Sequence, residues 1–241
     1  MKRTIRLTAL VALVAGLALA SCQKEDNNSS TASNGGNNGG GGSTPAGWVD
    51  LGLPSGLLWA ECNLGATSPE EYGNYYAWGE TQPKEVYDWS TYAYGNASNA
   101  LTKYCNNAEF GLNGFTDNLT TLQAMDDAAT AALGSGARTP TIEEWQELIN
   151  NTTVEWTTVN RVYNGRKFTG SNGNTLFLPA AGLRSNLYVD DAGSIGRYWS
   201  SSLERNGYPY YACEFYISSN GQSVSTCYRR VGFSVRAVRQ N

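Results

Sequence analysis

The clearest amphipathic pattern in this chain lies over residues 141–150. Four apolar residues recur there at the spacing of one helical face: Ile142, Trp145, Leu148 and Ile149. Thr141 is followed three residues later by Glu144, and this pair is typical of a capping box, in which each side chain accepts a hydrogen bond from the other residue's backbone N–H. The pattern therefore predicts a helix that begins after Thr141 and buries one face.

A weaker helical pattern extends over residues 119–133. Its apolar positions are Leu122, Met125, Ala129 and Leu133. Gly134 and Gly136 follow as stop signals. This region predicts one helix or two.

Elsewhere, short apolar stretches alternate with Asn, Gly and Ser, which is typical of strands joined by turns. The predicted strands cover 48–51, 57–60, 159–163, 166–169, 175–178, 198–201, 211–217, 222–227 and 232–238. Asn220-Gly221 between two of them is a strong hairpin signal. Together with the helical regions, these strands predict an α+β fold with long loops.

The N-terminal segment has a short basic head followed by an apolar run over 7–20. The run is short for a membrane span and ends on small residues, which is typical of a secretory signal. Its last residues, Leu-Ala-Ser-Cys at 19–22, resemble a bacterial lipobox, in which the cysteine is acylated after cleavage. We predict a signal peptide over 1–21 and a membrane-anchoring lipid on Cys22; the alternative is an ordinary signal with a free Cys22.

The residues after Cys22 indicate where the protein resides. Gln-Lys-Glu-Asp at 23–26 resembles the charged signal that directs lipoproteins of Bacteroidota to the cell surface; the alternative is an ordinary polar start to a linker. Residues 27–44 are almost entirely Asn, Gly, Ser and Thr, which predicts a flexible tether over 22–46. The sequence thus predicts an outer-membrane lipoprotein exposed on the cell surface.

Residues 47–241 are long enough to form one domain with its own core. The whole chain has a net charge of −4, and this domain is more acidic still, because basic residues predominate among the charged residues before it. It contains no basic cluster, so nucleic acid is not an expected partner.

Catalytic chemistry is constrained by the absence of histidine from the whole chain. This excludes Ser-His and Cys-His arrangements and removes the commonest general base. The glycines over 35–42 lie in the tether and not between a strand and a helix, so they form no phosphate loop. A carboxylate pair for glycoside hydrolysis stays open, although Glu143 and Glu144 are adjacent on a helix and point apart. The sequence therefore favours a protein that is not an enzyme.

Four cysteines follow Cys22: Cys62, Cys105, Cys213 and Cys227. An even number in an exported domain predicts two disulfides, with three possible connectivities. Cys213 and Cys227 flank the Asn220-Gly221 turn almost symmetrically, so we predict that they pair and that Cys62 pairs with Cys105. The alternative, a thiol pair for copper or redox chemistry, needs two neighbouring cysteines, and no such spacing occurs.

The strongest indication of binding is the aromatic segment over 72–94. Because Gly, Asn and Pro interrupt it, we expect an irregular surface loop whose rings contact a ligand. The predicted contact residues are Tyr87, Trp89, Tyr92 and Tyr94, with Tyr208 and Tyr210 as a second group. The alternative is that the rings pack on one another as a small core of the loop.

Patterned blocks recur along 47–241. They are Val-Asp-Leu-Gly-Leu-Pro-Ser-Gly at 49–56, Tyr-Tyr-Ala-Trp-Gly-Glu at 75–80, Arg-Thr-Pro-Thr at 138–141 with Glu144-Trp145, Phe-Leu-Pro-Ala-Ala-Gly at 177–182, Tyr-Trp-Ser-Ser at 198–201 and Gly-Phe-Ser-Val-Arg at 232–236. Their order resembles the Fibrobacter succinogenes major paralogous domain family. That family is similar to C-type-lectin-like and formylglycine-generating domains, so the resemblance implies antiparallel sheets, two helices and long irregular loops. It implies no particular activity.

The residues within these blocks also have structural interpretations. Trp59, Trp78, Trp145 and Trp199 are expected in the core or as loop anchors. Arg138 and Arg236 are expected to hold carboxylates or carbonyl groups in place.

Calcium is a candidate ligand because sugar-binding C-type lectins use it. Oxygen ligands are offered by Asn186, Asp190 and Asp191, and by Asp126 and Asp127. Neither group matches an EF-hand, and Gln82-Pro83-Lys84 departs from the sugar-binding triplet of these lectins at its third position. We therefore predict no metal and no cofactor, with calcium as the alternative.

These observations together predict a surface lipoprotein with a non-catalytic ligand-binding domain. A glycan is the preferred ligand and a protein the second choice. The alternatives are a structural or assembly component of the cell envelope and an enzyme related to sulfatase-modifying factors.

Overall fold

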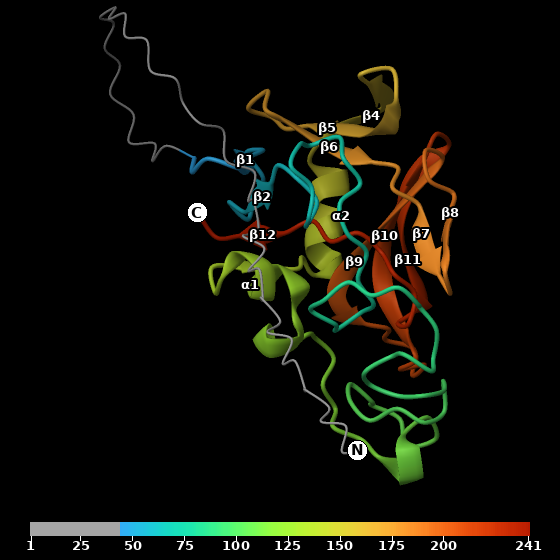
Figure 1. Ribbon diagram of the computed structural model, residues 1–241. Coiled ribbons are helices and arrows are strands. Elements are labelled where there is room, and N and C mark those ends of the chain that lie inside the picture. Colours follow the sequence, from blue (N-terminus) through green and yellow to red (C-terminus); the bar gives the residue numbers. More distant parts are fainter. Residues whose placement is uncertain (1–43) are drawn as a thin grey trace, which may run out of the picture.

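The computed structural model describes residues 44–241 and shows strands gathered around one central helix (Figure 1). The predicted signal peptide, the lipidation site at Cys22 and the tether as far as residue 43 lie outside the described residues. Residues 44–46 are exposed and lead directly into the first strand.

The strands are β1 (Trp48–Asp50), β2 (Leu58–Ala60), β3 (Ala137–Arg138), β4 (Thr153–Val159), β5 (Tyr163–Thr169), β6 (Thr175–Pro179), β7 (Leu183–Ser185), β8 (Tyr188–Asp190), β9 (Ile195–Leu203), β10 (Tyr211–Ser218), β11 (Gly221–Tyr228) and β12 (Val238–Arg239). The helices are α1 (Ala128–Leu133) and α2 (Ile142–Asn150), with short 3-10 turns η1 (Leu112–Gly114) and η2 (Ala124–Asp126).

The strands form four small antiparallel sheets. Their orders are β1-β2-β12-β3, β11-β10-β9, β4-β5-β6 and β7-β8. Between β2 and β3 the chain is irregular over more than 70 residues, with only isolated bridges and the short turns η1, η2 and helix α1. The described part of the chain is thus mostly antiparallel sheet with two α-helices, an α+β or mostly-β arrangement.

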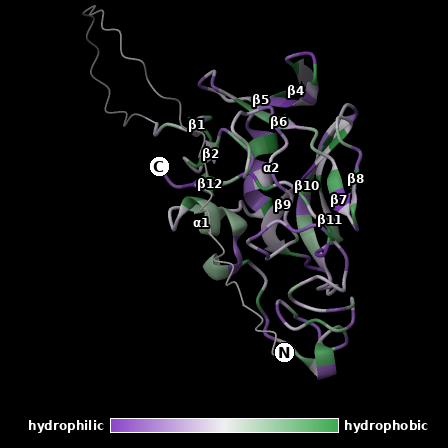
Figure 2. Cartoon of the chain, in the orientation of Figure 1, coloured by the Kyte–Doolittle hydropathy of each residue, from purple (hydrophilic) through white to green (hydrophobic). Residues whose placement is uncertain are grey.

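Helix α2 confirms the strongest sequence pattern. Thr141 and Glu144 form the capping box, each accepting a hydrogen bond from the other's backbone N–H. Trp145 and Leu148 are buried, and the Trp145 ring stacks on Phe215 of β10 at 4.6 Å between centroids. Burying a side chain of this size is worth on the order of 3 kcal/mol. Hydrophobic and hydrophilic residues alternate along α2, whose apolar face covers the β9–β10–β11 sheet (Figure 2).

The weaker helical pattern over 119–133 is only partly helical. Only η2 and α1 form, because the start of the segment is extended against β9: the Leu122 N–H donates to Ser201 and the Leu203 N–H donates to Thr120. Met125, assigned above to the apolar face, is 75% exposed. Tertiary pairing with β9 has overridden the local helical spacing.

Two of the predicted strands are wrong in extent. Residues 160–162 form the turn between β4 and β5, where Asn160 and Arg161 have φ of 53° and 60°. The segment 232–238 is a strand only at β12; before it, Phe233 and Ser234 make single bridges to different parts of the chain. The 232–238 segment crosses between sheets, so no single neighbour pairs with it throughout. The hairpin between β10 and β11 is confirmed, with Ser218 opposite Gly221.

The structural interpretations of the patterned tryptophans and arginines are confirmed. Trp59, Trp78, Trp145 and Trp199 are at most 1% exposed. Arg138 forms a two-point ion pair with Glu144 at 2.7 and 2.5 Å. Arg236 is fully buried and donates to Asn63 at 2.9 Å and to the carbonyls of Ala60 and Glu61. Burial lowers the pKa of Arg236 to about 10, so it remains charged at neutral pH.

The predicted disulfides are wrong. Cys105, Cys213 and Cys227 carry free thiols, so neither Cys213–Cys227 nor Cys62–Cys105 is formed. The reason for the first is register: Cys227 lies opposite Ala212, while Cys213 lies opposite Thr226. Since neighbouring residues in a strand point to opposite faces, the two thiols lie on different sides of the hairpin. This also removes them as a thiol pair for redox chemistry.

Replacing Cys227 by Ala is therefore expected to change the free energy of unfolding by about 1 kcal/mol or less, compared with roughly 2–5 kcal/mol for loss of a native disulfide. The measurement is denaturant unfolding with and without reductant, together with alkylation of the unfolded protein under non-reducing conditions. Alkylated Cys105, Cys213 and Cys227 are the expected result. A reductant-dependent loss of several kcal/mol would show a bridge.

Candidate ligand-binding surface

Six aromatic side chains from four separate segments meet at the end of the β10–β11 hairpin. We call them the aromatic platform: Trp89, Phe110, Tyr208, Tyr210, Tyr211 and Tyr228. Tyr208 is 48% exposed and Tyr228 is 37% exposed, and the other four are half-buried. In Figure 1 the loops over 95–117, drawn in green, lie beside this end of the hairpin.

The platform is one continuous row of rings. Centroid distances run from Trp89 to Tyr228 at 6.3 Å and from Tyr228 to Tyr210 at 5.9 Å, the second pair stacked at 25°. From Tyr210 the row continues to Phe110 at 5.0 Å and from Phe110 to Tyr208 at 6.1 Å. These spacings are those of mutually supporting aromatic pairs. The rings therefore form a connected cluster whose most exposed members are Tyr208 and Tyr228.

Backbone pairing and one buried carboxylate hold the platform in shape. Tyr211 and Tyr228 are direct partners at the open end of the β10–β11 ladder. The carboxylate of Glu204, itself 4% exposed, accepts from the N–H groups of Asn206 at 2.7 Å and Tyr208 at 3.0 Å. The Asn107 side chain donates to the Gly207 carbonyl at 3.1 Å, which ties the Phe110 loop to the Tyr208 turn.

Arg229 anchors the platform from behind. It is fully buried and donates to the carbonyls of Lys103, Tyr104 and Pro209 at 2.8–3.0 Å. Its Nε donates to the Tyr92 hydroxyl at 2.9 Å, and its guanidinium lies 5.3 Å from the ring centroids of Trp78 and Tyr92. Sequence reasoning missed this residue, because nothing local distinguishes Arg229 from its half-buried neighbour Arg230.

The predicted contact residues separate into two groups. Trp89, Tyr208 and Tyr210 lie on the platform. Tyr87 and Tyr92 are 0% and 6% exposed, so their expected exposure is wrong. They pack with Ala77 as a small core of the loop, which is the alternative raised by the sequence.

The hydroxyl groups of the buried tyrosines have internal partners. Tyr87 donates to the Tyr75 carbonyl at 2.6 Å and Tyr92 donates to the Trp78 carbonyl at 2.8 Å. Burial raises the pKa of Tyr92 to about 12. Tyr94 is half-buried and donates to Asp126 at 2.7 Å, so its hydroxyl also has a partner within the fold.

Phe110, Tyr211 and Tyr228 complete the platform, although they were not among the predicted contact residues. Tyr211 follows the predicted pair Tyr208 and Tyr210 directly, so the local richness in tyrosine was its only signal. Phe110 and Tyr228 are isolated aromatics far apart in the sequence. Only the pairing of β10 with β11 and the packing of the Phe110 loop bring them together.

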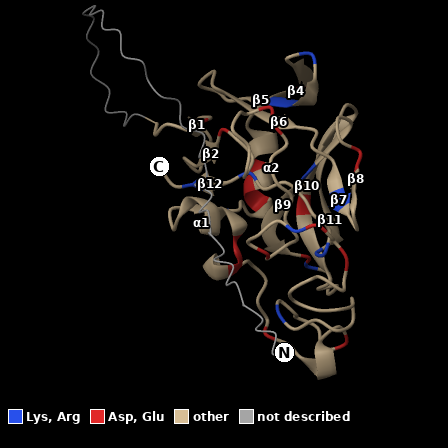
Figure 3. Cartoon of the chain, in the orientation of Figure 1, with Lys and Arg blue, Asp and Glu red and all other residues tan. Residues whose placement is uncertain are grey.

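The surroundings of the platform are polar. The hydrogen bond with Tyr228 raises the pKa of Tyr211 to about 12, so the Tyr211 phenol is neutral at physiological pH. The guanidinium of Arg230 lies 5.4 Å from the Tyr228 ring centroid. Acidic and basic residues are dispersed over the rest of the fold, with glutamates on α2 and on β10 (Figure 3).

Two of the oxygen ligands considered for calcium, Asp126 and Asp127, accept hydrogen bonds from other residues of the fold. Asp126 accepts from Tyr94, Lys103 and Tyr104, and these bonds hold the pKa of its carboxyl below the ordinary value despite burial. Asp127 caps α1 and accepts from both the N–H and the hydroxyl of Thr139. Within residues 44–241 no three His, Cys, Asp or Glu side chains converge as a metal site would require.

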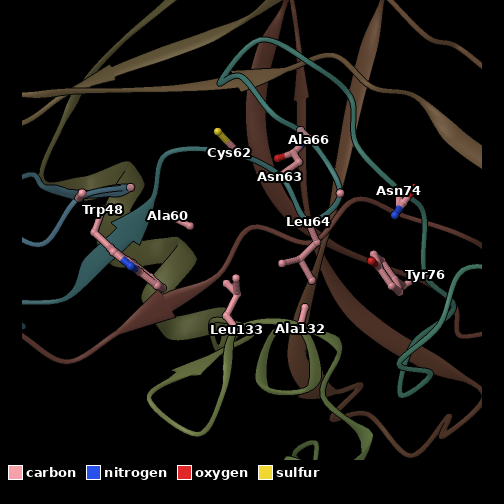
Figure 4. A pocket seen from close by; sticks show the side chains of 13 residues that line it. Trp48, Ala60, Cys62, Asn63, Leu64, Ala66, Asn74, Tyr76, Ala132 and Leu133 are labelled. Carbon is pink, nitrogen blue, oxygen red and sulfur yellow. The ribbon is translucent and has the colours of Figure 1, made fainter. Parts of the chain in front are cut away.

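A cavity lies at the other end of the fold, next to β1 and α1. This cavity of about 130 Å³ is lined mainly by apolar groups such as Trp48, Leu64 and Leu133 (Figure 4). It is smaller than the roughly 300 Å³ at which small-molecule sites begin. Larger cavities of about 390, 470 and 630 Å³ lie elsewhere on the fold, and none of them is lined by a platform ring. The aromatic platform is the stronger candidate for ligand contact because it gathers partly exposed aromatic rings.

No family model, curated protein or solved structure matches this chain. Within the described residues, neither helix has the length and apolarity needed to cross a membrane.

Proposed function

We propose that this protein binds glycans non-catalytically through the aromatic platform. The observation that carries the proposal is the continuous row of partly exposed rings from Trp89 to Tyr208. Sugar rings have apolar C–H faces that pack on flat aromatic faces, and their hydroxyl groups find partners at the platform's edge. Partly exposed aromatic rings that cluster on a folded domain are typical of an interaction site.

The shape of the platform favours a glycan over a protein segment. Its rings follow one another in a row, so it suits a ligand that repeats along its length. The rings are held by a buried carboxylate and a buried arginine, which reduces the ordering entropy lost on binding.

The wider setting proposed from the sequence agrees with this activity. Resemblance to the Fibrobacter succinogenes major paralogous domain family supports a C-type-lectin-like fold, and the antiparallel sheets and two helices are compatible with it. The lipobox ending at Cys22 and the tether after it support anchoring to the outer membrane with the domain on the cell surface.

The direct test is a glycan array probed with the full-length protein in a detergent that contains no sugar. One series contains calcium and the other a chelator. Binding in both series is expected, because the platform uses rings and hydroxyl groups instead of an ion. Binding that depends on calcium would contradict this mechanism, and the absence of all glycan binding would contradict the proposed function.

Replacing Trp89 by Ala is expected to weaken glycan binding about tenfold or more, since large aromatic side chains contribute most of the energy of an interface. A moderate fall in melting temperature is also expected, because Trp89 packs against the buried Tyr92 at 5.7 Å between ring centroids, so affinity is measured well below the unfolding transition. The matched control is Trp156→Ala, which removes an equally half-buried indole on β4, outside the platform. Equal effects of the two variants on affinity would refute the role of the platform.

A further inference from the structure

Among residues 44–241, two arginines that contact Tyr87 form no ion pair, and one of them lies at the edge of the platform. Arg230 lies against the Tyr228 ring and donates one hydrogen bond, from Nη1 to the Tyr87 carbonyl at 3.3 Å. Arg184 on β7 donates from Nη1 to the Lys84 carbonyl, also at 3.3 Å, and its guanidinium lies 5.8 Å from the Tyr87 ring centroid. Both guanidinium groups thus contact Tyr87, one at its ring and the other at its backbone.

Arg184 and Arg230 are both half-buried and lack an ion pair, whereas three other arginines of the described residues have one. Arg138, Arg197 and Arg205 each form an ion pair with a glutamate. Neither Arg184 nor Arg230 lies within ion-pair distance of a carboxylate among residues 44–241. In addition, the Nε of each is buried without a hydrogen-bond partner.

Such a group retains most of its binding capacity. A guanidinium offers five N–H donors in a rigid fork that fits a carboxylate or a sulfate, and each of these two arginines uses one donor in a long bond. Because no carboxylate among residues 44–241 pairs with either arginine, the Nη groups of both can pair with an external anion.

The backbone around Tyr87 holds the two arginines in place. Arg184 and Gly232 exchange two backbone hydrogen bonds of 2.8 Å. A Cβ at Gly232 would lie 2.6 Å from the Tyr87 ring, so glycine is needed there for the ring to pack down. Tyr87 is buried and therefore unavailable to a ligand. Its ring contacts Arg184 and its carbonyl accepts from Arg230, and both contacts hold the arginines in place.

We propose that the ligand is an acidic glycan, whose sugar rings pack on the aromatic platform and whose carboxylate or sulfate pairs with Arg230, with Arg184 as the second cation. This inference rests on the proposed function and names its substrate class. Arg230 connects the two parts of the site, because it lies over the Tyr228 ring at the edge of the platform and donates to the carbonyl of Tyr87, whose ring Arg184 contacts.

The test compares two pairs of polysaccharides that differ only in charge. Polygalacturonate and its carboxyl-reduced form test the carboxylate; a sulfated galactan and its desulfated form test the sulfate. The full-length protein is expected to bind at least one acidic member about tenfold or more tightly than its neutral partner. The pair that shows the difference identifies the anion.

The Arg230→Gln variant is expected to lose this preference, so that it binds the acidic and the neutral member about equally well. The matched control is Arg239→Gln, which removes the same charge from β12, where the arginine lies over Trp48 away from the platform. It is expected to bind as the unaltered protein does. Arg230→Lys keeps the charge without the fork and is expected to retain part of the preference.

The outcomes distinguish the two proposals. Equal binding of acidic and neutral members, abolished by Trp89→Ala, would overturn the acidic-glycan inference and leave glycan binding standing. A preference that survives both Arg230→Gln and Arg184→Gln would also overturn the inference. Loss of binding to every polysaccharide and every array glycan would overturn both. If Arg230→Gln fails to fold, Arg184→Gln and the preference of the unaltered protein decide the question.

Discussion

Replacing Arg229 by Met is expected to lower the free energy of unfolding by about 3 kcal/mol or more. Methionine keeps much of the volume of the side chain but has no N–H donor. The carbonyl groups of Lys103, Tyr104 and Pro209 would then remain buried without their donor. Each such loss costs about 1 kcal/mol or more, because water cannot reach the carbonyl in the folded protein.

An opposing effect reduces this loss without reversing it. Arg229 is fully buried and has no carboxylate partner, so removing its charge relieves a desolvation cost. Replacing a buried ion pair by apolar residues can leave stability unchanged, because both polar groups are removed. In Arg229→Met the backbone acceptors remain and lose their donor, so the free energy of unfolding falls.

The measurement is equilibrium unfolding in denaturant, with Arg230→Met as the control. Arg230 is the next residue but is half-buried and makes a single long hydrogen bond, so its replacement is expected to cost less than about 1 kcal/mol. Similar effects of the two variants would show that Arg229 is not an anchor. We also expect Arg229→Met to weaken glycan binding, because Arg229 connects the loops at Lys103 and Pro209 that flank Phe110 and Tyr210.

The second large effect is a dependence of stability on the ionisation of Glu214. This residue is central in β10 and 0% exposed. One carboxylate oxygen pairs with Arg197, and the other is buried without a partner. Burial raises the pKa of Glu214 from 4.5 to about 7, although Arg197 opposes the shift.

The sign of the effect follows from the raised pKa. Between the unfolded pKa of 4.5 and the folded pKa of about 7, the folded state holds a proton that the unfolded state has released. Stability from Glu214 is therefore fully present below pH 4.5 and is lost as the pH rises through 7. The difference in pKa corresponds to a loss of about 3 kcal/mol across this range.

The Glu214→Gln variant isolates this effect, because glutamine stays neutral at every pH. Unfolding free energies from pH 4 to pH 8 are expected to favour the variant progressively as the pH rises. Asp126 and Glu143, whose pKa values are lowered, change stability at more acidic pH and cancel in the difference between the two proteins. The pKa of Cys227 is about 11, so this neighbouring thiol does not titrate in the range. A constant difference between the two curves would contradict a raised pKa at Glu214.

Several parts of this protein could be derived from the sequence because they depend on local interactions. The α2 helix forms where its capping box and apolar face predict it, since both signals lie within a few residues of each other. The β10–β11 hairpin forms around its predicted turn for the same reason. Trp145 and Trp199 are buried, as expected of large aromatics within apolar patterns.

Other parts depended on contacts between distant segments. The 119–133 region is mostly non-helical because β9 pairs with its start. Cys213 and Cys227 flank the turn symmetrically, but a register offset of one residue sends their side chains to opposite faces. Counting residues on each side of a turn could not reveal that offset.

The candidate site shows the same division. The sequence alone indicated that the site is rich in aromatic residues and that Trp89, Tyr208 and Tyr210 are contact residues. Only the tertiary structure decided that Tyr87 and Tyr92 are buried, that Phe110 and Tyr228 join the surface, and that Arg229 is an anchor while Arg230 is available. The physical reason is that composition determines which side chains can pack or bind, whereas exposure depends on which distant segments cover them.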